Sequence, residues 1–459
     1  MAAPRKLTAR YAGSGKLLVL GALAVAALAG WGVTRLAILT GTAGDRPYEL
    51  PLVWLTASLL LWWLPLAWLE RPVTVPPGAR KRIDALRVTV QVPVYNEDPE
   101  ALRACLRSVL TQSRPVNRVR VVDDGSALAG EPVSYDDVRR DFECEAMLRG
   151  IETTWDRTAN RGKRFAQMHV LAEDDGDVFV TLDSDSVLDR HAVREGLAPF
   201  ADPRVRSVAG QVLVLNRAAG LLARLTGVLY LPFTRGLRSA QSVLRRVTMN
   251  SGALAFYRAD VVRACAGAYE NECFRGRPMQ MNDDSMLTFY ASLSGHTVHQ
   301  PSSMVFTLAP ERFGHYAKQQ LRWMRGTAVR HLWWLRYQPL TGPVFWTTVA
   351  EYLHLLLALA VPVVLVADPA YRGRLGELAL AAAQVTVAMN YLMALRLFTV
   401  RRSDESPGAR LLAFALAPLA CVWRSLVLRP MYVYALLTCR RVNRWGTRGA
   451  VEVSLSTAA

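Results

Sequence analysis

The sequence has few of the residues that build structural metal sites or disulfide frameworks. Its 459 residues include six cysteines and seven histidines, with no Cys-x-x-Cys pair and no histidine near a cysteine at metal-ligand spacing. A zinc site is therefore not expected. The scattered cysteines are typical of reduced packing residues in a cytoplasmic domain.

Acidic side chains are also in short supply. The chain has 38 Asp and Glu against 55 Lys and Arg, which gives a formal net charge of +17. Basic residues are concentrated in the N-terminal tail and in segments 71–82 and 401–410. Such a charge favours nucleic acid, lipid headgroups, or an anionic sugar nucleotide or polymer as a partner. Because long apolar runs flank the basic segments, lipid headgroups are the simpler partner and nucleic acid is not expected.

Several long runs are almost without charge. Residues 17–40 and 51–69 are each long enough to cross a hydrocarbon core of about 30 Å. No convincing small-residue cleavage site follows the first run, so the pair predicts a membrane anchor rather than a signal peptide. Three more apolar runs occupy 343–366, 376–399 and 409–427. By the positive-inside rule the basic segments and the middle of the chain are cytoplasmic, which predicts a multi-pass protein of the plasma membrane.

The last crossings are open to two interpretations. Segments 409–427 and 430–440, which are broken at Arg429-Pro430, form either a tight pair of crossings or a re-entrant, interfacial pair.

These changes in composition divide the chain into six parts. The predicted parts are an N-terminal tail with two transmembrane helices (1–70), a basic linker (71–85), a soluble domain (86–310), an interfacial helix (311–340), C-terminal transmembrane or interfacial helices (341–440) and a cytoplasmic tail (441–459).

The soluble domain alternates between strand and helix patterns. This alternation predicts an open, mostly parallel sheet of the α/β, Rossmann-like class, in which ligands bind beyond the carboxyl ends of the strands. A further apolar segment, 221–244, contains Arg224, Arg235 and Arg238 and predicts an interfacial helix. The predicted strands are 86–93, 118–122, 150–155 and 178–182, and the predicted helices are 101–112, 135–150 and 165–173.

Two carboxylates follow the strand at 178–182. If the chain stays extended there, Asp183 and Asp185 point to the same side, and such hard oxygen donors suit Mg²⁺ or Mn²⁺ with a phosphate-bearing ligand. Solvated loop acids are the simpler interpretation of an isolated Asp-x-Asp. However, two other strands end in the polar loops Tyr95–Asp98 and Asp123–Ser126. Three such ends at one sheet edge favour a nucleotide with a metal.

Other polar residues add chemistry to this edge. Asp283-Asp284 would cap a helix if taken alone, but a separate carboxylate can also take a proton from an attacking hydroxyl. Arg322 beside Trp323 offers a cation for phosphate and a flat face for a sugar ring, although such pairs also anchor helices at membrane surfaces. Lys163 reaches phosphate if its turn faces the site, whereas a solvated turn is the alternative.

Seven short motifs then occur in one order along the chain. In this order, and with flanking apolar runs, they resemble the processive, membrane-integrated family-2 glycosyltransferases, which include hyaluronan, chitin and cellulose synthases. The segments Leu222–Ser242, Leu428–Tyr434 and Trp445–Arg448 are most similar to class I hyaluronan synthases. The seven motifs are Val92–Glu97, Val121–Ser126, Asn160–Arg164, Asp183–Asp185, Ser251–Ala253, Asp283-Asp284 and Gln319–Trp323.

The resemblance covers roughly residues 86–448 and implies a GT-A-type domain. Such a domain joins UDP-sugars into a β-linked polymer that passes through the enzyme's own membrane channel. It implies that Asp183 and Asp185 hold the nucleotide and a divalent metal, Mg²⁺ or Mn²⁺. It also implies Asp284 as the general base. The implied catalytic residues are Asp283, Asp284, Arg322 and Trp323, and the implied substrate-binding residues are Tyr95, Glu97, Asp123, Asp124, Lys163, Asp183, Ser251, Gln319, Trp445 and Arg448.

Within this set the resemblance assigns finer roles. Tyr95, Glu97 and Asp123 contact the uridine, and Lys163 contacts the diphosphate. Gln319, Arg322 and Trp323 line the acceptor end and the pyrophosphate. Trp445 and Arg448 close over UDP.

Two departures from the family pattern bear on the sugars. Hyaluronan synthases usually have Gly-Asp-Asp-Arg where this chain has Asn282–Ser285, and Cys-Ser-Gly-Pro where it has Asn250–Ala253. The base and the metal residues are retained. The interpretation is a hyaluronan synthase that uses UDP-glucuronate and UDP-N-acetylglucosamine. A single-sugar synthase of the chitin or chitooligosaccharide type, a nucleotide-binding transporter and a transferase to a lipid carrier are the alternatives.

Overall fold

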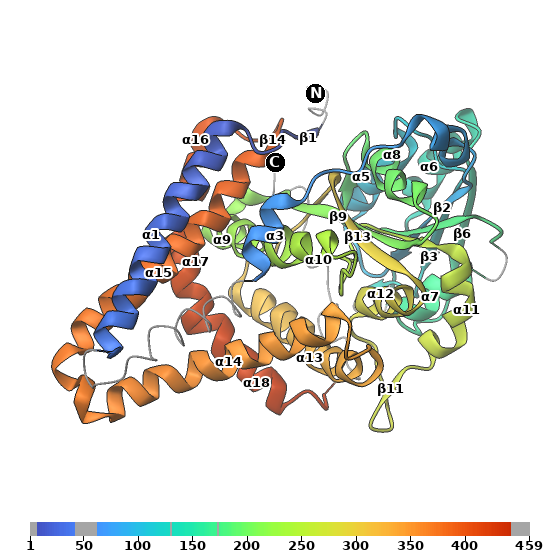
Figure 1. The fold of residues 1–459 in the computed structure, drawn as a ribbon. Coiled ribbons are helices and arrows are strands. Elements are labelled where there is room, and N and C mark those ends of the chain that lie inside the picture. The colour runs from blue at the N-terminus through green and yellow to red at the C-terminus, as the bar shows by residue number, and fades with distance from the viewer. Residues whose placement is uncertain (1–6, 42–61, 129–130, 172–173, 442–459) are drawn as a thin grey trace.

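The computed structural model describes residues 7–41, 62–128, 131–171 and 174–441. It places an α/β domain beside a group of long helices, with α1 (Lys16–Gly41), α14 (Pro343–Ala367) and α15 (Leu375–Ala394) away from the sheet (Figure 1). This arrangement confirms the predicted α/β domain between apolar helical ends.

The central sheet has eight strands in the order β6-β3-β2-β7-β10-β9-β13-β8. Its first four strands are parallel, and each overlaps a strand that the sequence predicts. The bounds are β6 Glu152–Arg157, β3 Arg118–Asp123, β2 Val88–Val94, β7 Val178–Thr181, β10 Ala255–Arg258, β9 Val205–Val214, β13 His296–Thr307 and β8 Val187–Leu188.

The other half of the sheet differs from the predicted parallel arrangement. Strand β10 runs antiparallel to both β7 and β9, and β8 runs antiparallel to β13. Only β9 and β13 pair in parallel there. The loop before β10 lies at the ligand-facing edge of the sheet. The chain therefore enters β10 at that edge, whereas it leaves β2, β3 and β7 there, and β10 runs in the opposite direction. The loop Asn250–Ala253 is thereby placed next to the end of β7.

The helices between the parallel strands agree with the predicted ones. They are α5 (Pro99–Leu110), α6 (Asp136–Leu148) and α7 (Lys163–His169). Asp98 caps α5 by accepting a hydrogen bond from the backbone N–H of Glu100, and proline occupies the first helical position. The first polar loop therefore ends in a fixed helix start.

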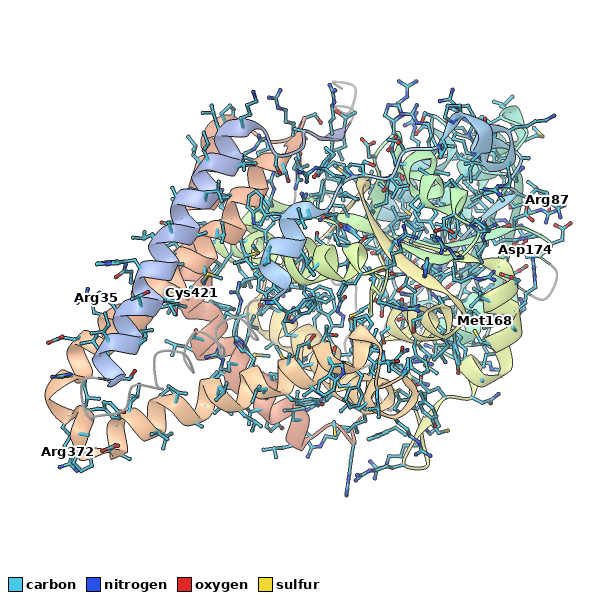
Figure 2. All side chains as sticks on the ribbon, in the orientation of Figure 1. Arg35, Arg87, Met168, Asp174, Arg372 and Cys421 are labelled. Atoms are coloured by element: carbon cyan, nitrogen blue, oxygen red, sulfur yellow. The ribbon has the colours of Figure 1, made fainter. Side chains whose placement is uncertain are left out.

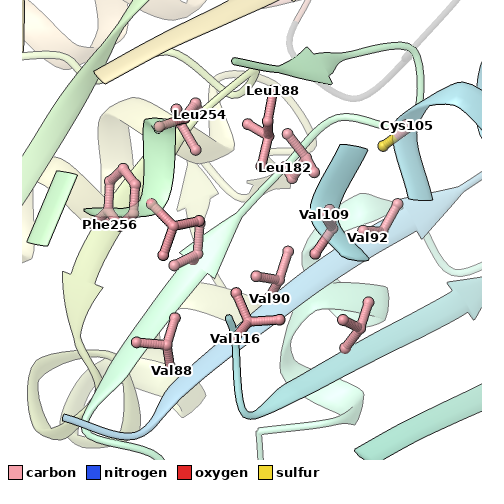
Figure 3. Close-up of a cluster of buried hydrophobic side chains, with 14 of the residues drawn as sticks. Val88, Val90, Val92, Cys105, Val109, Val116, Leu182, Leu188, Leu254 and Phe256 are labelled. Carbon is pink, nitrogen blue, oxygen red and sulfur yellow. The ribbon is translucent and has the colours of Figure 1, made fainter. Parts of the chain in front are cut away.

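The core fixes the strand ends that face the ligand edge. Every residue of β2 is buried, as expected for a central strand covered on both faces. Val90 and Val92 pack in one cluster with Val109 of α5 and Leu182, which follows β7 (Figure 3). Burial of each such side chain contributes about 1.5–3 kcal/mol, so the positions of the following loops are firmly set.

Among the residues that the structure describes, three helices are each long and apolar enough to cross a membrane. They span Lys16–Thr40, Pro343–Ala367 and Pro369–Thr399, in agreement with three of the predicted runs. Figure 2 shows Arg35 of the first helix and Arg372, between the other two, far from Arg87 and Asp174 at the opposite edge of the α/β domain. Of the predicted run 51–69, only α3 (Trp63–Leu69) is described, and residues 51–61 lie outside the described part.

The C-terminal helices differ from the prediction. The break lies between α16 (Pro407–Ala415) and α17 (Ala417–Trp423), not at Arg429-Pro430. The chain bends there by 43° and continues through a π-helical turn, Arg424–Leu428, into α18 (Arg429–Leu437). A π turn accommodates the proline that follows it because the backbone hydrogen-bond register is already shifted. The two pieces are long and apolar enough to cross a membrane only when taken together, as one broken span or a re-entrant segment.

The predicted interfacial helix 221–244 forms in three pieces: α9 (Leu221–Leu229), a π-helical turn (Pro232–Leu237) and α10 (Arg238–Val243). Two of its arginines do not face headgroups. Arg235 donates to the Thr399 hydroxyl, Arg238 donates to Ser251 Oγ at 2.8 Å, and both side chains are buried. The segment bridges the α/β domain and the apolar helices, so its charges find partners within the protein.

Candidate active site

A cavity of about 820 Å³ lies along the carboxyl ends of β2 and β7. It extends under α13 (Phe313–Tyr337) to α14 and α18. Its volume is within the range typical of ligand pockets. It brings together most of the predicted site residues: Tyr95, Asp124, Lys163, Asp183, Asp185, Ser251, Asp283, Asp284, Gln319, Arg322 and Trp323.

Four predicted site residues are not among those lining the cavity. Glu97 is buried, and its Oε2 accepts the Ser184 hydroxyl at 2.7 Å, so it supports the turn that carries the two aspartates. Asp123 is also buried and accepts the backbone N–H of Ser126 at 2.9 Å. Trp445 and Arg448 lie outside the described residues.

The two aspartates after β7 lie on a turn rather than on extended chain. The backbone N–H of Ser186 donates to the carbonyl of Asp183 at 3.0 Å. The condition that the chain stays extended through Asp183–Asp185 is therefore not met, because strand pairing ends at Thr181. Both carboxylates nevertheless line the cavity, and Oδ1 of Asp185 accepts the Thr307 hydroxyl at 3.4 Å.

Lys163 lies between two carboxylates at the centre of the site. Its ammonium is 2.7 Å from Asp183 Oδ1 and 2.9 Å from Asp283 Oδ2. Burial opposes its charge, but the two carboxylates raise the pKa of Lys163, so the ammonium stays protonated. The loop that carries Lys163 is fixed by Asp124, whose carboxylate accepts the backbone N–H groups of Arg161 and Gly162 at 2.9 and 2.8 Å.

Asp283 and Asp284 form the first turn of α12 (Asp283–Ser294), as the helix-cap interpretation requires, but they also face the cavity. Oδ2 of Asp284 accepts the backbone N–H of Gly252 at 3.0 Å. Burial, followed by the charge of Asp283, raises the pKa of Asp284 to about 7. Against the effect of burial, Lys163 holds the pKa of Asp283 below its usual value.

The pKa values of these two adjacent carboxyl groups are shifted in opposite directions, so the groups suit different chemical roles. Asp283 stays ionised beside Lys163, whereas Asp284 exchanges its proton near neutral pH. A pKa near the working pH is what a general base requires. By the directions of these pKa shifts, Asp284 is better suited than Asp283 to accept a proton.

Gly252 allows the loop before β10 to approach the acids closely. A Cβ at this position would lie 3.1 Å from both Asp183 Oδ2 and Lys163 Nζ. The neighbouring Asn250, where the family pattern has Cys, lines the cavity and is fully buried. Its side chain interacts with the Tyr257 hydroxyl, so this departure from the family pattern places a polar amide group in the wall of the cavity.

Helix α13 forms the opposite wall. Its residues Gln320, Trp323, Thr327, His331 and Trp334 recur at three- and four-residue spacing and all line the cavity. The Trp323 ring lies 6.1 Å from that of Tyr230, and its side chain keeps 39% exposure. A partly exposed tryptophan in the wall of a cavity can offer an aromatic face for a sugar ring to stack on.

The same helix places a buried cation beside the position where the family pattern has an arginine after its two aspartates, but this cation is not among the residues that line the cavity. Here Ser285 occupies that position, and Arg330 of α13 donates to Ser285 Oγ at 3.2 Å. Arg330 is fully buried and pairs with Glu272 at 3.0 Å. Gly326 lets α13 approach, because a Cβ there would overlap the Asn282 carboxamide.

Several residues of the cavity are not predicted from the sequence. Tyr230, His331, Glu351 and Tyr432 line it and come from four different helical segments. One of them carries a signal in the sequence: Glu351 is the sole acidic residue of the apolar run that forms α14. A carboxylate in such a run is costly and marks a functional position.

The acids after β7 fit a divalent metal that is shared with a ligand. Within the described ranges, no group of three His, Cys, Asp or Glu residues is arranged to hold a metal ion. Mg²⁺ is commonly bound by one or two carboxylates together with substrate phosphates. Asp185 and Asp183 supply that number of carboxylates, and Lys163 supplies a further positive charge for a diphosphate.

Comparison with known proteins identifies the relatives of this chain. Residues 86–326 match the family described as Glycosyltransferase like family 2. The chain is 31% identical over 376 residues to the hyaluronan synthase of Streptococcus pyogenes serotype M1, which covers 80% of this chain and 84% of the relative. It is 32% identical over 368 residues to the N-acetylglucosaminyltransferase of Sinorhizobium fredii, which covers 79% of this chain and 84% of that protein.

A solved structure supports the fold. The mannosyltransferase of Pyrobaculum calidifontis, determined with GDP-mannose and Mn²⁺, superposes with a TM-score of 0.51 at 22% sequence identity. The match covers 86% of this chain and 99% of that protein. The α/β domain accordingly has the predicted GT-A-type fold.

Proposed function

This chain belongs to glycosyltransferase family 2, and on that premise we propose that it is a processive, inverting synthase of a β-linked polysaccharide. The observation that carries the proposal is the course of one cavity. It contains the acids after β7 and Asp284, and it continues to Glu351 of an apolar helix. A transferase site that opens toward membrane-length helices suits a product that leaves through the membrane.

The donor in this proposal is a UDP-sugar held at the ends of β2 and β7. Tyr95 and the loop around Asp124 receive the nucleotide, and Lys163 faces the diphosphate. Asp185 and Asp183 would hold Mg²⁺ or Mn²⁺, which when bound would neutralise charge on the leaving UDP. Lys163 adds a positive charge on the same side, which stabilises the departing diphosphate.

The acceptor hydroxyl enters from the α13 side. Asp284 takes its proton, and the hydroxyl oxygen attacks the anomeric carbon from the face opposite UDP, so the configuration inverts. Trp323 provides a stacking face for the acceptor sugar, and Arg322 provides positive charge. The N–H of Gly252, at 3.0 Å from Asp284, fixes the orientation of the base.

We propose UDP-glucuronate and UDP-N-acetylglucosamine as the donors and hyaluronan as the product. The second candidate, a single-sugar synthase of the chitin or chitooligosaccharide type, is favoured by the similarity to an N-acetylglucosaminyltransferase and by the two motif departures. In either case the site faces the cytoplasm of a multi-pass plasma-membrane protein, because the basic segments lie beside the apolar helices.

One experiment separates these products. The protein is purified in detergent and incubated with each UDP-sugar alone and with both, in Mg²⁺ or Mn²⁺. Hyaluronan synthesis requires both sugars and incorporates labelled glucuronate into polymer, whereas polymer from UDP-N-acetylglucosamine alone identifies the single-sugar alternative. Long polymer made without an added lipid acceptor excludes transfer to a lipid carrier. An Asp284→Asn variant serves as the inactive control.

A further inference from the structure

The residue before the two acids of α12 has an unusual backbone conformation. Asn282 directly precedes the helix and lies in the left-handed region, with φ 51° and ψ 53°. Few residues other than glycine adopt this conformation, although asparagine does so more readily than most. The turn leads directly into Asp283 and Asp284, so the backbone of Asn282 determines where the first turn of α12 begins.

The side chain of Asn282 does not act as a helix cap. An asparagine before a helix usually accepts a hydrogen bond from a backbone N–H of the first turn, and no such bond is formed here. Instead, Asn282 Nδ2 donates to the backbone carbonyl of Trp323 in α13, at 3.2 Å. The buried side chain therefore joins the start of α12 to the part of α13 that carries the Trp323 ring.

Gly326 of α13 provides the space for this contact. A Cβ at position 326 would overlap the Asn282 side chain, to which its three nearest atoms all belong. The carboxamide therefore lies directly against the backbone of α13, three residues after Trp323. A larger residue at position 326 fits only if the carboxamide moves or is absent.

A second set of hydrogen bonds joins the same two helices. Arg330 Nε of α13 donates to Ser285 Oγ at 3.2 Å, and this hydroxyl donates to the carbonyl of Asn282 at 2.9 Å. The side chain of Asn282 is thus held by α13 directly, and its carbonyl is held through Ser285. The direct connection is the one at the cavity, since Asn282 and Trp323 line it and Arg330 is not among the lining residues.

We propose that Asn282 is a positioning residue that fixes the Trp323 ring relative to the Asp284 carboxyl group. The proposal rests on the proposed synthase function, in which Trp323 stacks on the acceptor sugar and Asp284 takes its proton. Asn282 acts through these two groups and not on the reacting atoms. It sets the separation of the two groups, so that the acceptor hydroxyl lies within reach of the base.

This contact is a property of this chain rather than of the family pattern. That pattern has glycine where this chain has Asn282. Glycine adopts the left-handed conformation readily, but it has no side chain that reaches α13. The asparagine therefore retains the backbone turn and adds a connection between the base and the aromatic wall of the cavity.

The first test variant is Asn282→Gly, which removes the connection and preserves the backbone turn. A displacement of about 1 Å in an active site can lower the rate by about 10²-fold, so kcat should fall by roughly 10- to 100-fold. The KM for the UDP-sugar should stay within about twofold, because the donor is held at the ends of β2 and β7. Calorimetry of UDP binding with Mg²⁺ should give an unchanged stoichiometry, which excludes unfolded protein as the cause of the lower kcat.

The second variant, Gly326→Ala, tests the same contact from α13. Its Cβ displaces the carboxamide, so the defect should be the same although Asn282 is present. In the double variant the carboxamide is absent and the Cβ has space, so kcat should lie within about twofold of that of Asn282→Gly alone, whereas independent effects would multiply. The matched control is Gly314→Ala in the same helix, where a Cβ meets nothing within 4 Å and kcat should be unchanged.

The outcomes distinguish this inference from the proposed function. If the unmodified protein makes no polymer from any UDP-sugar, the proposed function fails and this inference fails with it. If polymer forms but Asn282→Gly keeps the kcat of the unmodified protein, only the positioning role is overturned. It is also overturned if the defects of the two single variants multiply in the double variant, or if both single variants lose UDP binding, because the contact would then be structural.

Discussion

Lys163 forms an ion pair with Asp183 in which the ammonium nitrogen lies 2.7 Å from Oδ1. The same ammonium contacts Asp283, the neighbour of the proposed base. One lysine therefore connects the acids at the nucleotide side with those at the acceptor side. Its charge supports the ionised form of both aspartates and is available to a diphosphate.

Replacement of Lys163 by Met should lower kcat/KM for the UDP-sugar by about 10²- to 10³-fold, the range found when one charge-stabilising donor is removed. The variant loses a cation near the leaving group and leaves the half-buried Asp183 and the buried Asp283 without their shared ammonium partner. Steady-state UDP release measures the effect, and Lys163→Arg is the control that retains charge. A Met variant with unchanged kcat/KM would contradict this role.

The rate of transfer should rise with pH through neutrality. Asp284 has a pKa raised to about 7, so it is protonated below that pH and ionised above it. A general base acts in its ionised form, and kcat/KM should fall about tenfold for each pH unit below the pKa. The profile is measured between pH 5.5 and 8.5. In Asp284→Asn the remaining rate should be at least 10²-fold lower, and a flat profile in the unmodified protein would exclude Asp284 as the base.

Chelation of divalent metal should stop transfer, and Mg²⁺ or Mn²⁺ should restore it. Asp185→Asn should weaken metal-dependent turnover strongly, because Asp185 and Asp183 supply the protein's oxygen ligands in the proposed site. Membrane insertion of the variant should be unchanged, which fractionation checks. Normal polymer synthesis by Asp185→Asn would overturn the metal assignment.

Much of the fold could be predicted because its signals are local. Alternating apolar residues and helical spacing locate β2, α5 and β3, and the polar loops mark the edge where ligands bind. Asp183 and Asp185 were therefore found from their place after a buried strand. The turn that they adopt was not found, because it depends on where pairing with β2 ends.

The remaining features depend on contacts between distant parts of the chain. The antiparallel direction of β10 follows from the path of the chain through 221–254. The spacing of apolar residues predicts a strand but not its direction in the sheet. The pairing of Lys163 with both Asp183 and Asp283 joins three separate loops. Likewise, the inward direction of Arg238 depends on α3 and on the loop of Ser251, which a single helical pattern does not contain.

Gly252→Ala should reduce activity without unfolding the protein. The added Cβ would lie 3.1 Å from Lys163 Nζ and Asp183 Oδ2, so the loop or the ion pair must shift by a few tenths of an ångström. A displacement of this kind in an active site lowers kcat more than it lowers stability. Gly267→Ala is the matched control, since a Cβ there meets nothing within 4 Å. Equal activity of the two variants would show that the close approach at Gly252 is unimportant.

Glu70→Ala should destabilise the junction between α3 and the sheet. The Glu70 carboxylate lies 2.8 Å from His299 Nδ1, accepts the Ser239 hydroxyl at 2.5 Å and contacts Arg396, and all four side chains are buried. Removing one partner of a buried ionic group costs about 3–5 kcal/mol, because the remaining charge has no compensation. Thermal unfolding in detergent should therefore begin at a clearly lower temperature.

The control for this prediction is Glu145→Ala on α6. Glu145 pairs with Arg149 at 2.8 Å, but both side chains are partly exposed, and such surface pairs contribute about 0–1 kcal/mol. The free energy of unfolding should therefore change far less than in Glu70→Ala. Equal midpoints for the two variants would mean that the Glu70 cluster does not hold the apolar helices to the α/β domain. The attachment would then depend on other contacts, such as the apolar contacts of Trp63 and Leu64 of α3 with Met393 of α15.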